Sequence, residues 1–247
     1  TGLPTRVSQG DVRQARNPSH GDYRSITLCA GNLAECYTEV VRAFNLADRF
    51  MQPVIVLTDE TIGHMHGKAM IPTEEEVKKG IVPRKTFTGA PADYRPYGVA
   101  GDEAAVLNPM FQGYRYHFTG LHHDAKGFPT EEIETCRKLI QRLEDKVMMH
   151  TDELELNEEY MCDDLEENDV LIIAYGSVSL AAKESIRHLR AAGIKAGLFR
   201  PITLWPSPAE RIKHFTDKVK NVLCVELNIR QYTEEVERVS SRLDIHG

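Results

Sequence analysis

Apolar residues in the first sixty positions follow two different periods. Residues 25–30 and 53–58 are short apolar runs rich in strand-forming side chains, as is typical of buried strands. Between them, apolar residues over 33–47 recur at helical spacing, and Asn32 followed three residues later by Glu35 predicts a helix cap. This β-α-β pattern predicts a parallel sheet with a right-handed crossover.

The carboxyl-terminal part of the chain repeats the alternation. The pattern predicts strands at 169–175, 195–199 and 221–225, and helices at 178–192, near 208–215 and after Asn228. Gly193 stands where the first of these helices should stop. Strands that alternate with helices predict a doubly wound parallel sheet, so we expect an α/β protein with two such units.

The segment between the two units is less regular. Residues 71–128 carry many Pro, Gly and Tyr residues without a sustained period, which favours a long functional loop or an inserted lobe. A helical period returns over 131–150. Residues 152–168 are strongly acidic, and we interpret them as a linker and partly helical surface.

Composition excludes several classes of function. The 247 residues are 41% hydrophobic and carry a net charge of -7, which argues against a nucleic-acid partner. No apolar run is long enough to span a membrane, and the first residues do not resemble a signal peptide, so we expect a cytoplasmic protein. The chain opens in a loop without an initiator Met, which suggests a partial polypeptide.

The five cysteines are scattered, and none forms a C-x-x-C pair. This spacing fits a reducing compartment and does not support an iron–sulfur cluster held by this chain alone. An electron carrier would therefore have to come from another polypeptide.

Two polar pairs follow predicted strands, at the edge where α/β sheets usually bind ligands. Asp59 and Glu60 could bind metal or move protons, but capping of the next turn is the favoured interpretation. Gly176 and Ser177 could place backbone amides against a phosphate. Because the glycine-rich loops of nucleotide sites are missing here, an ordinary helix N-cap at Ser177 is favoured.

Clustered histidines raise a metal hypothesis. The candidate ligands are His64, His66, His117, His122, His123 and Asp124. His64 and His66 would point to opposite faces of a strand, and no H-E-x-x-H pattern is present. Hydrogen bonds that order a loop are therefore the favoured role for these side chains.

The opening segment gathers hydroxyl, guanidinium, amide and carboxylate groups ahead of the first strand. The residues concerned are Thr1-Gly2-Leu3-Pro4-Thr5-Arg6, Gln9-Gly10-Asp11 and His20-Gly21-Asp22. Such a set could hold a small dianionic substrate, with the guanidinium bound to a carboxylate in a bidentate manner. Without further information, a polar loop with no ligand is the favoured interpretation.

These opening motifs, together with others spread along the chain, resemble a known family. The further motifs are Ala43–Ala47, Pro53-Val54, Asp59-Glu60 with Gly63-His64-Met65, Tyr116–Leu121, Gly127–Thr130, Tyr175–Ser177, Phe199–Pro206, and Glu226 with Asn228 and Gln231. In order and identity they resemble the alpha subunit of 2-oxoglutarate:ferredoxin (acceptor) oxidoreductases. The resemblance covers nearly the whole chain.

The resemblance implies a thiamine diphosphate enzyme that decarboxylates a 2-oxoacid, passes electrons through a [4Fe-4S] cluster to ferredoxin and forms an acyl-CoA. Thiamine diphosphate would be shared with a beta subunit that holds Mg²⁺ and the cluster, and gamma and delta subunits are further expected partners. By the same resemblance, 1–130 would be the remainder of a pyrimidine-binding domain with an inserted lobe, 131–168 a linker, and 169–247 an incomplete domain like the carboxyl-terminal domain of transketolase.

The resemblance also implies roles for single residues. Thr5 matches a threonine implicated in 2-oxoacid recognition, and Arg6 shares that substrate-binding segment. Gly2, Gln9 and His20 are expected close to the cofactor. The glutamate that activates the aminopyrimidine in this family would precede Thr1, so no catalytic residue is expected in this chain, and the chain by itself should be inactive.

Three alternatives remain open from the sequence. The substrate could be pyruvate or a branched-chain 2-oxoacid, because sister enzymes share the architecture. The chain could instead be a non-catalytic α/β interaction module. The third alternative is a metal-dependent hydrolase built on His117, His122, His123 and Asp124.

Overall fold

The first sheet has three strands in the order β2-β1-β6 in the computed structural model, which describes residues 6–247. Strands β1 (Ile26–Cys29) and β2 (Val54–Leu57) are parallel and are joined by α2 (Leu33–Phe50). Asn32 accepts a hydrogen bond from the Glu35 amide, which confirms the predicted cap. Strand β6 (Thr203–Trp205) pairs antiparallel with β1.

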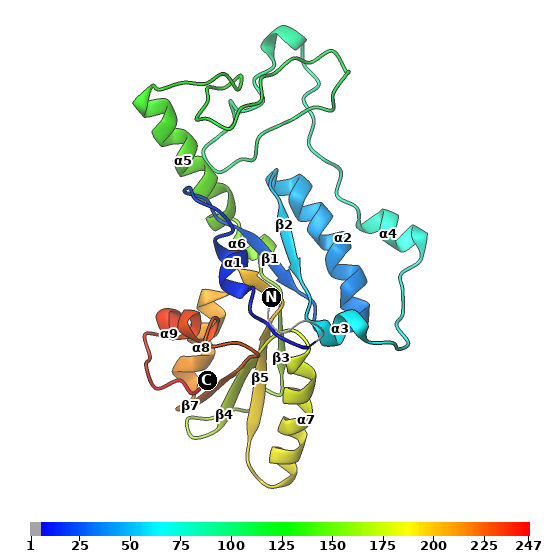
Figure 1. Cartoon of the computed structure of the whole chain (residues 1–247), viewed down its shortest axis with the longest axis vertical. Coiled ribbons are helices and arrows are strands. Elements are labelled where there is room, and N and C mark those ends of the chain that lie inside the picture. Colours follow the sequence, from blue (N-terminus) through cyan, green and yellow to red (C-terminus); the bar gives the residue numbers. More distant parts are fainter. Residues whose placement is uncertain (1–5) are drawn as a thin grey trace.

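The second sheet has four strands in the order β3-β5-β4-β7. Its parallel strands are β4 (Val170–Ala174), β5 (Ala196–Pro201) and β7 (Asn221–Val225), and β3 (Asn157–Tyr160) pairs antiparallel with β5. Helix α7 (Val178–Ala191) covers one face, and α8 (Ala209–Lys218) and α9 (Thr233–Ser240) lie on the other (Figure 1).

The remaining elements are short, apart from one long helix. They are α1 (Val12–Arg16), α3 (Glu60–His64), α4 (Glu74–Gly80), the 3-10 turn η1 (Pro91–Asp93), α5 (Ile133–Met148) and α6 (Thr151–Leu154). Residues 65–132, which we call the lobe, extend away from both sheets toward the free end of α5 (Figure 1).

Separate apolar clusters fill the layers around the sheets. Ile26, Leu28 and Phe50 pack between the first sheet, α2 and the end of α5. The cluster under α8 and α9 includes Trp205, whose indole Nε1 donates to the Val12 carbonyl at 2.9 Å. Helix α1 is thereby fixed against the core, which positions the opening segment relative to both sheets.

The predicted α/β class with two parallel-sheet units is confirmed, but each sheet also gains an antiparallel strand that was not expected. Strand β3 lies inside the acidic stretch that we interpreted as a linker. Its sequence has no apolar alternation, because its side chains make ion pairs, such as Glu159 with Arg211, instead of entering a core. Strand β6 was missed because only Ile202 separates it from β5.

The lobe is irregular, as predicted, and is ordered around one buried amide. The Asn108 side chain accepts from the Phe87 amide (2.7 Å) and donates to the Phe87 carbonyl (2.8 Å). Its backbone amide donates to the hydroxyl of Tyr94, which donates in turn to the Val106 carbonyl. Four aromatic rings pack around this centre, those of Phe87, Tyr94, Tyr114 and Tyr116. A small cluster of polar and aromatic side chains therefore orders the lobe.

Candidate functional site

The carboxyl ends of the two sheets face each other, and we call this junction the seam. It consists of Gln9, Gly31, Glu35, Asp59, Glu158, Tyr175, Gly176, Arg200, Glu226 and Asn228. Ligands of open α/β sheets usually lie outside the carboxyl ends of the strands. Here each sheet occupies that region of the other, so the seam is the natural place to look for a site.

Gln9 lies in the middle of the seam, where its Nε2 is 3.5 Å from Asp59 Oδ2 of the first unit and its other bonds are to the second unit. Its side-chain Nε2 donates to the Tyr175 carbonyl at 3.0 Å, and its Oε1 accepts from the Leu227 amide at 3.0 Å. The Gln9 backbone amide donates to the Leu227 carbonyl, and Asn228 donates to the Gln9 carbonyl. Gln9 is 7% exposed, so it anchors the opening segment at the seam.

The first pair after a strand behaves as predicted. Asp59 caps α3 by accepting from the Ile62 amide at 3.1 Å. Its second oxygen accepts from the Ser177 amide at 2.9 Å. The backbone amide at the start of α7, which could have bound a phosphate, is therefore bonded to the carboxylate of Asp59.

Ser177 occupies the N-cap position of α7, as favoured from the sequence, but it does not act as an ordinary side-chain cap. The Ser177 side chain makes no cap bond, whereas the Ser179 hydroxyl donates to the Gly176 carbonyl at 2.7 Å. Gly176 has φ of +59°, and a Cβ there would lie 2.7 Å from Gln9 Nε2. Glycine is thus required by conformation and by the close approach of Gln9.

A buried arginine joins the two units through carboxylates. Arg200, on β5, donates to both oxygens of Glu35 on α2 at 2.8 and 2.6 Å, and its Nε donates to Glu158 at 2.7 Å. Burial opposes its charge, but the bonds to Glu35 raise the pKa of Arg200 above its usual value. A Cβ on Gly31 would lie 2.1 Å from Arg200 Nη1, so the guanidinium needs glycine beside it.

Arg200 and Glu35 were not singled out as site residues from the sequence. The available signal was a charged residue inside an apolar strand, at the centre of the Phe199-Arg200-Pro201 motif. Buried charges in such positions are almost always paired.

Tyr175 and Cys29, which lies beside the seam, are the two candidates there for a nucleophile. Burial and the neighbouring Glu226, which accepts from the Tyr175 hydroxyl at 2.8 Å, raise the pKa of Tyr175 above its usual value. Burial, followed by the charge of Asp59, raises the pKa of the Cys29 thiol to about 12. Neither group ionises near neutral pH, so neither offers a nucleophile.

The structure separates the residues expected to bind substrate or lie near cofactor. Gln9 is in the seam, Arg6 is exposed three residues before it, and His20 is exposed beyond α1, where Ser19 Oγ lies 3.3 Å from its Nδ1. Thr5 and Gly2 lie outside the described residues. The roles of all five remain predictions.

The histidines do not converge on a metal site. His64 Nδ1 lies 2.8 Å from Glu60 Oε1, and His117 stacks on the Phe128 ring. Asp124 instead accepts from the backbone amides of its own turn. Over residues 6–247 no three His, Cys, Asp or Glu side chains form a group suited to a metal ion. The four residues proposed for a metal-dependent hydrolase therefore do not form a metal site.

Comparison with known families matches both halves of the chain. Residues 1–142 match the model "Pyruvate flavodoxin/ferredoxin oxidoreductase, thiamine diP-bdg", and residues 168–246 match "Pyruvate:ferredoxin oxidoreductase core domain II". The chain belongs to the pyruvate flavodoxin/ferredoxin oxidoreductase family. Its first matched range ends inside α5, and its second begins just before β4.

Within this oxidoreductase family, the chain is 38% identical to the 2-oxoglutarate synthase subunit KorA of Methanothermobacter marburgensis, over 98% of this chain and 63% of that protein. It is 36% identical to the KorA subunit of Methanocaldococcus jannaschii, over 99% and 63% of the two chains. The ketoisovalerate oxidoreductase subunit VorB of Methanothermobacter thermautotrophicus is 29% identical, over 96% and 58%. These similarities confirm the resemblance stated from the motifs.

A solved structure shares the fold. The 2-oxoglutarate:ferredoxin oxidoreductase from Magnetococcus marinus, with 2-oxoglutarate, coenzyme A and succinyl-CoA bound, superposes with a TM-score of 0.87 at 26% identity. The match covers 99% of this chain and 42% of that chain. The present chain thus spans less than two thirds of the length of these family members.

No helix formed by residues 6–247 has both the length and the apolar character needed to cross a membrane.

Proposed function

We propose that the chain is part of the alpha subunit of a 2-oxoglutarate:ferredoxin oxidoreductase. The enzyme would oxidatively decarboxylate 2-oxoglutarate with coenzyme A to succinyl-CoA and CO₂ and pass the electrons to ferredoxin. The observation that carries this proposal is the gradient of identity: four KorA subunits reach 34–38%, whereas the VorB relatives stay at 29%. Pyruvate or a branched-chain 2-oxoacid is the weaker substrate assignment.

The described residues do not by themselves fit thiamine diphosphate. The cavity at the seam, between Gln9, Cys29, Asp59 and Tyr175, has a volume of about 20 Å³, which admits little more than a water molecule. The side chains around it bond to one another across the seam. In the proposed enzyme, the cofactor is therefore shared with a beta subunit that holds Mg²⁺ and a [4Fe-4S] cluster.

The seam gives this chain a positioning role in the proposed enzyme. Gln9 is hydrogen-bonded both to Tyr175, just after β4, and to Leu227, just after β7. Residues 6–8, which directly precede Gln9, therefore start from a fixed point at the edge of the sheet. Arg6 is exposed there, and its guanidinium is suited to bind a carboxylate of the substrate. We assign Thr5 and Arg6 to 2-oxoacid binding, and place Gly2, Gln9 and His20 near the cofactor.

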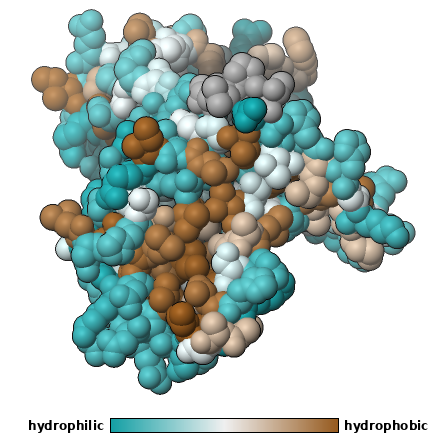
Figure 2. Space-filling model, turned by 60° about the horizontal axis from the view of Figure 1, so that its bottom comes forward, coloured by the Kyte–Doolittle hydropathy of each residue, from teal (hydrophilic) through white to brown (hydrophobic). Residues whose placement is uncertain are grey.

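Exposed apolar side chains support an assembly of several subunits. Phe44 on α2 is 73% exposed and Ile133 at the start of α5 is 83% exposed. Figure 2 shows an apolar strip between hydrophilic flanks on one face of the molecule. Surfaces of this kind often bind other proteins, as expected for a subunit that meets a beta subunit, with gamma and delta subunits and ferredoxin as further partners.

The test is kinetic and uses the complete assembled enzyme. Thr5→Ala should lower kcat/KM for 2-oxoglutarate by about ten-fold or more, the loss of one hydrogen bond near a charge. Thr38→Ala is the matched control, because Thr38 is an exposed threonine on α2 and should leave the kinetics unchanged.

Two results would contradict the proposal in different ways. Faster turnover of a branched-chain 2-oxoacid or of pyruvate than of 2-oxoglutarate would overturn the substrate. Failure of any 2-oxoacid to react in a preparation with a stoichiometric thiamine diphosphate subunit would favour the non-catalytic α/β module.

A further inference from the structure

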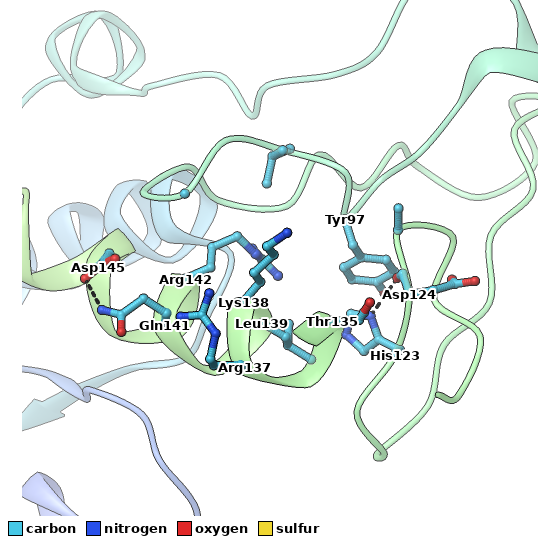
Figure 3. Close-up of a pocket in the computed structure, with 13 residues that line it drawn as sticks. Tyr97, His123, Asp124, Thr135, Arg137, Lys138, Leu139, Gln141, Arg142 and Asp145 are labelled. Atoms are coloured by element: carbon cyan, nitrogen blue, oxygen red, sulfur yellow. Dashed lines mark hydrogen bonds between the residues drawn. The ribbon is translucent and has the colours of Figure 1, made fainter. Parts of the chain in front are cut away.

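A cavity of about 460 Å³ lies between α5 and the lobe, outside the seam. One wall is α5, with Lys138, Gln141 and Arg142, and the opposite wall is the loop that carries Tyr97 and His123 (Figure 3). Its volume is within the range of small-molecule sites in proteins, roughly 300–1,000 Å³. Arg6, Gln9 and His20, which were predicted to bind substrate or lie near the cofactor, do not line it, whereas His123 and Asp124 of the metal hypothesis do.

Arg142 is buried at this cavity without an acidic partner. It is 8% exposed, and its Nη1 donates to the Glu103 carbonyl at 3.3 Å. Among residues 6–247 no carboxylate forms an ion pair with it. A guanidinium has five N–H donors, and none of the Arg142 nitrogens is among the buried atoms without a partner, so its remaining donors reach the cavity, where an anion can bind them.

One helical turn further along α5, a second cationic side chain is buried. Lys146 is 5% exposed, and its ammonium group donates to the Phe50 carbonyl at 2.9 Å. Burial lowers the pKa of Arg142, and burial followed by the charge of Arg142 lowers the pKa of Lys146 to about 8. Two buried cations thus repel each other along one face of α5, and an anion beside Arg142 would relieve that repulsion.

The carboxylates that border the cavity are already engaged elsewhere. Asp124 accepts from the Lys126 and Phe128 amides at 2.8 and 3.0 Å, and Asp145 accepts from Gln141 at 2.8 Å. Neither neutralises Arg142, so the positive charge of the buried wall remains available to a ligand.

The opposite wall is aromatic. The Tyr97 and His123 rings lie 4.2 Å apart between centroids, and the His123 Nδ1 is 3.0 Å from the Asp124 carbonyl, which fixes the ring. The two rings are inclined at 52° to each other, so a planar ring can pack against the face or edge of one of them. The cationic wall suits a phosphate, which arginine binds as well as carboxylate. The aromatic rings and the cationic wall together fit a nucleotide better than a simple carboxylate.

We propose that this cavity binds a nucleotide-type phosphate ester, with its phosphate held by Arg142 and Lys138 and its ring against Tyr97 and His123. The side chain of Lys138 is 70% exposed, and its ammonium lies 3.4 Å from Glu134, so it can turn toward a phosphate. The ligand is either a free nucleotide or the adenosine phosphate part of coenzyme A, which share this chemistry.

The experiment is a calorimetric titration of the assembled enzyme with ADP, which needs no turnover. Arg142→Gln should weaken ADP binding by about ten-fold or more, because the charge-assisted hydrogen bonds to the phosphate are lost. Lys138→Gln should weaken it several-fold. Arg137→Gln is the matched control, because Arg137 borders the same cavity but is bonded to both oxygens of Glu134.

The outcomes separate the possibilities. Absence of ADP binding to the native enzyme, or equal binding by Lys138→Gln and the native enzyme, overturns the proposal. The second criterion also decides the matter if Arg142→Gln fails to fold, because Lys138 is at the surface. If binding is lost as expected, competition by coenzyme A assigns the site to that substrate, and lack of competition assigns it to a free nucleotide. Both are independent of which 2-oxoacid the enzyme uses.

Discussion

The seam and the lobe are held together by different kinds of contact. At the seam, the buried charges of Arg200 and Glu35 and the amide of Gln9 tie together elements that are far apart in the chain. In the lobe, Asn108 and Tyr94 bond to backbone groups within the lobe. Long-range pairs make the seam part of the whole fold. The lobe is also bonded to α2 and α5, through Asn45, Asp48 and Arg142, but the bonds at its centre stay within it, so we expect it to open more readily than the seam.

This difference has a physical consequence for how each region responds to substitution. Removing one partner of a buried ion pair leaves a charge without compensation and destabilises every element attached to it. Removing bonds that stay within one segment loosens that segment first, and local opening then costs less than global unfolding. The two regions should therefore separate in experiments that read global and local stability.

The largest effect is expected at Arg200. Arg200→Met leaves Glu35 partly buried without a cationic partner, whereas Glu158 keeps Lys183. The change should cost about 3–5 kcal/mol, on the order of 10 °C in the melting temperature. Calorimetry of the intact subunit measures this. The control is Arg187→Met on α7, an exposed arginine whose loss should change stability by less than about 1 kcal/mol. Equal melting temperatures for the two variants would contradict a seam held by Arg200.

A smaller effect is expected at Lys146, where α5 meets the core beneath the lobe. Its pKa of about 8 lies below the usual 10.5 because of burial. Below pH 8 both the folded and the unfolded chains carry the proton, and the folded chain bears the full cost of the buried charge. Between about pH 8 and 10.5 only the unfolded chain is protonated, so the stability of the native protein rises with pH.

Lys146→Met removes this titration. At pH 7 the free energy of unfolding of the variant should exceed that of the native protein by about 3 kcal/mol at most, and at pH 9.5 the difference should be smaller. Urea unfolding at the two pH values checks this. Parallel changes in the native protein and the variant would show that Lys146 is not the group responsible.

The smallest global effect is expected at Asn108. Asn108→Ala removes the side-chain bonds to Phe87 and should destabilise the lobe locally by about 2 kcal/mol. Limited trypsin cleavage after Arg84 or Lys85 should become faster by ten-fold or more, while the melting temperature of the subunit changes little. A fall in melting temperature as large as that of Arg200→Met would mean that the lobe is not an independent unit.

Much of the fold was predictable, because apolar periodicity determines strands such as β1 and β4 and helices such as α2 and α5. Strand β3 escaped prediction since Asn157–Tyr160 owes its conformation to pairing with β5 rather than to local preference. The contacts of the candidate site were harder to predict from the sequence. Asp59 could be anticipated as a cap from its neighbours, but the approach of Asp59 to Ser177 joins residues 118 positions apart, which no local pattern reports.

The step from β5 to β6 bears on how such proteins can exchange parts during evolution. Ala196–Pro201 belongs to the second sheet and Thr203–Trp205 to the first, with a single residue between them. A recombination event that replaced only residues 168–246 would therefore also import a foreign strand into the sheet of the first matched range. Chimeras between relatives should be viable only when β1 is inherited with β6 and Glu35 with Arg200.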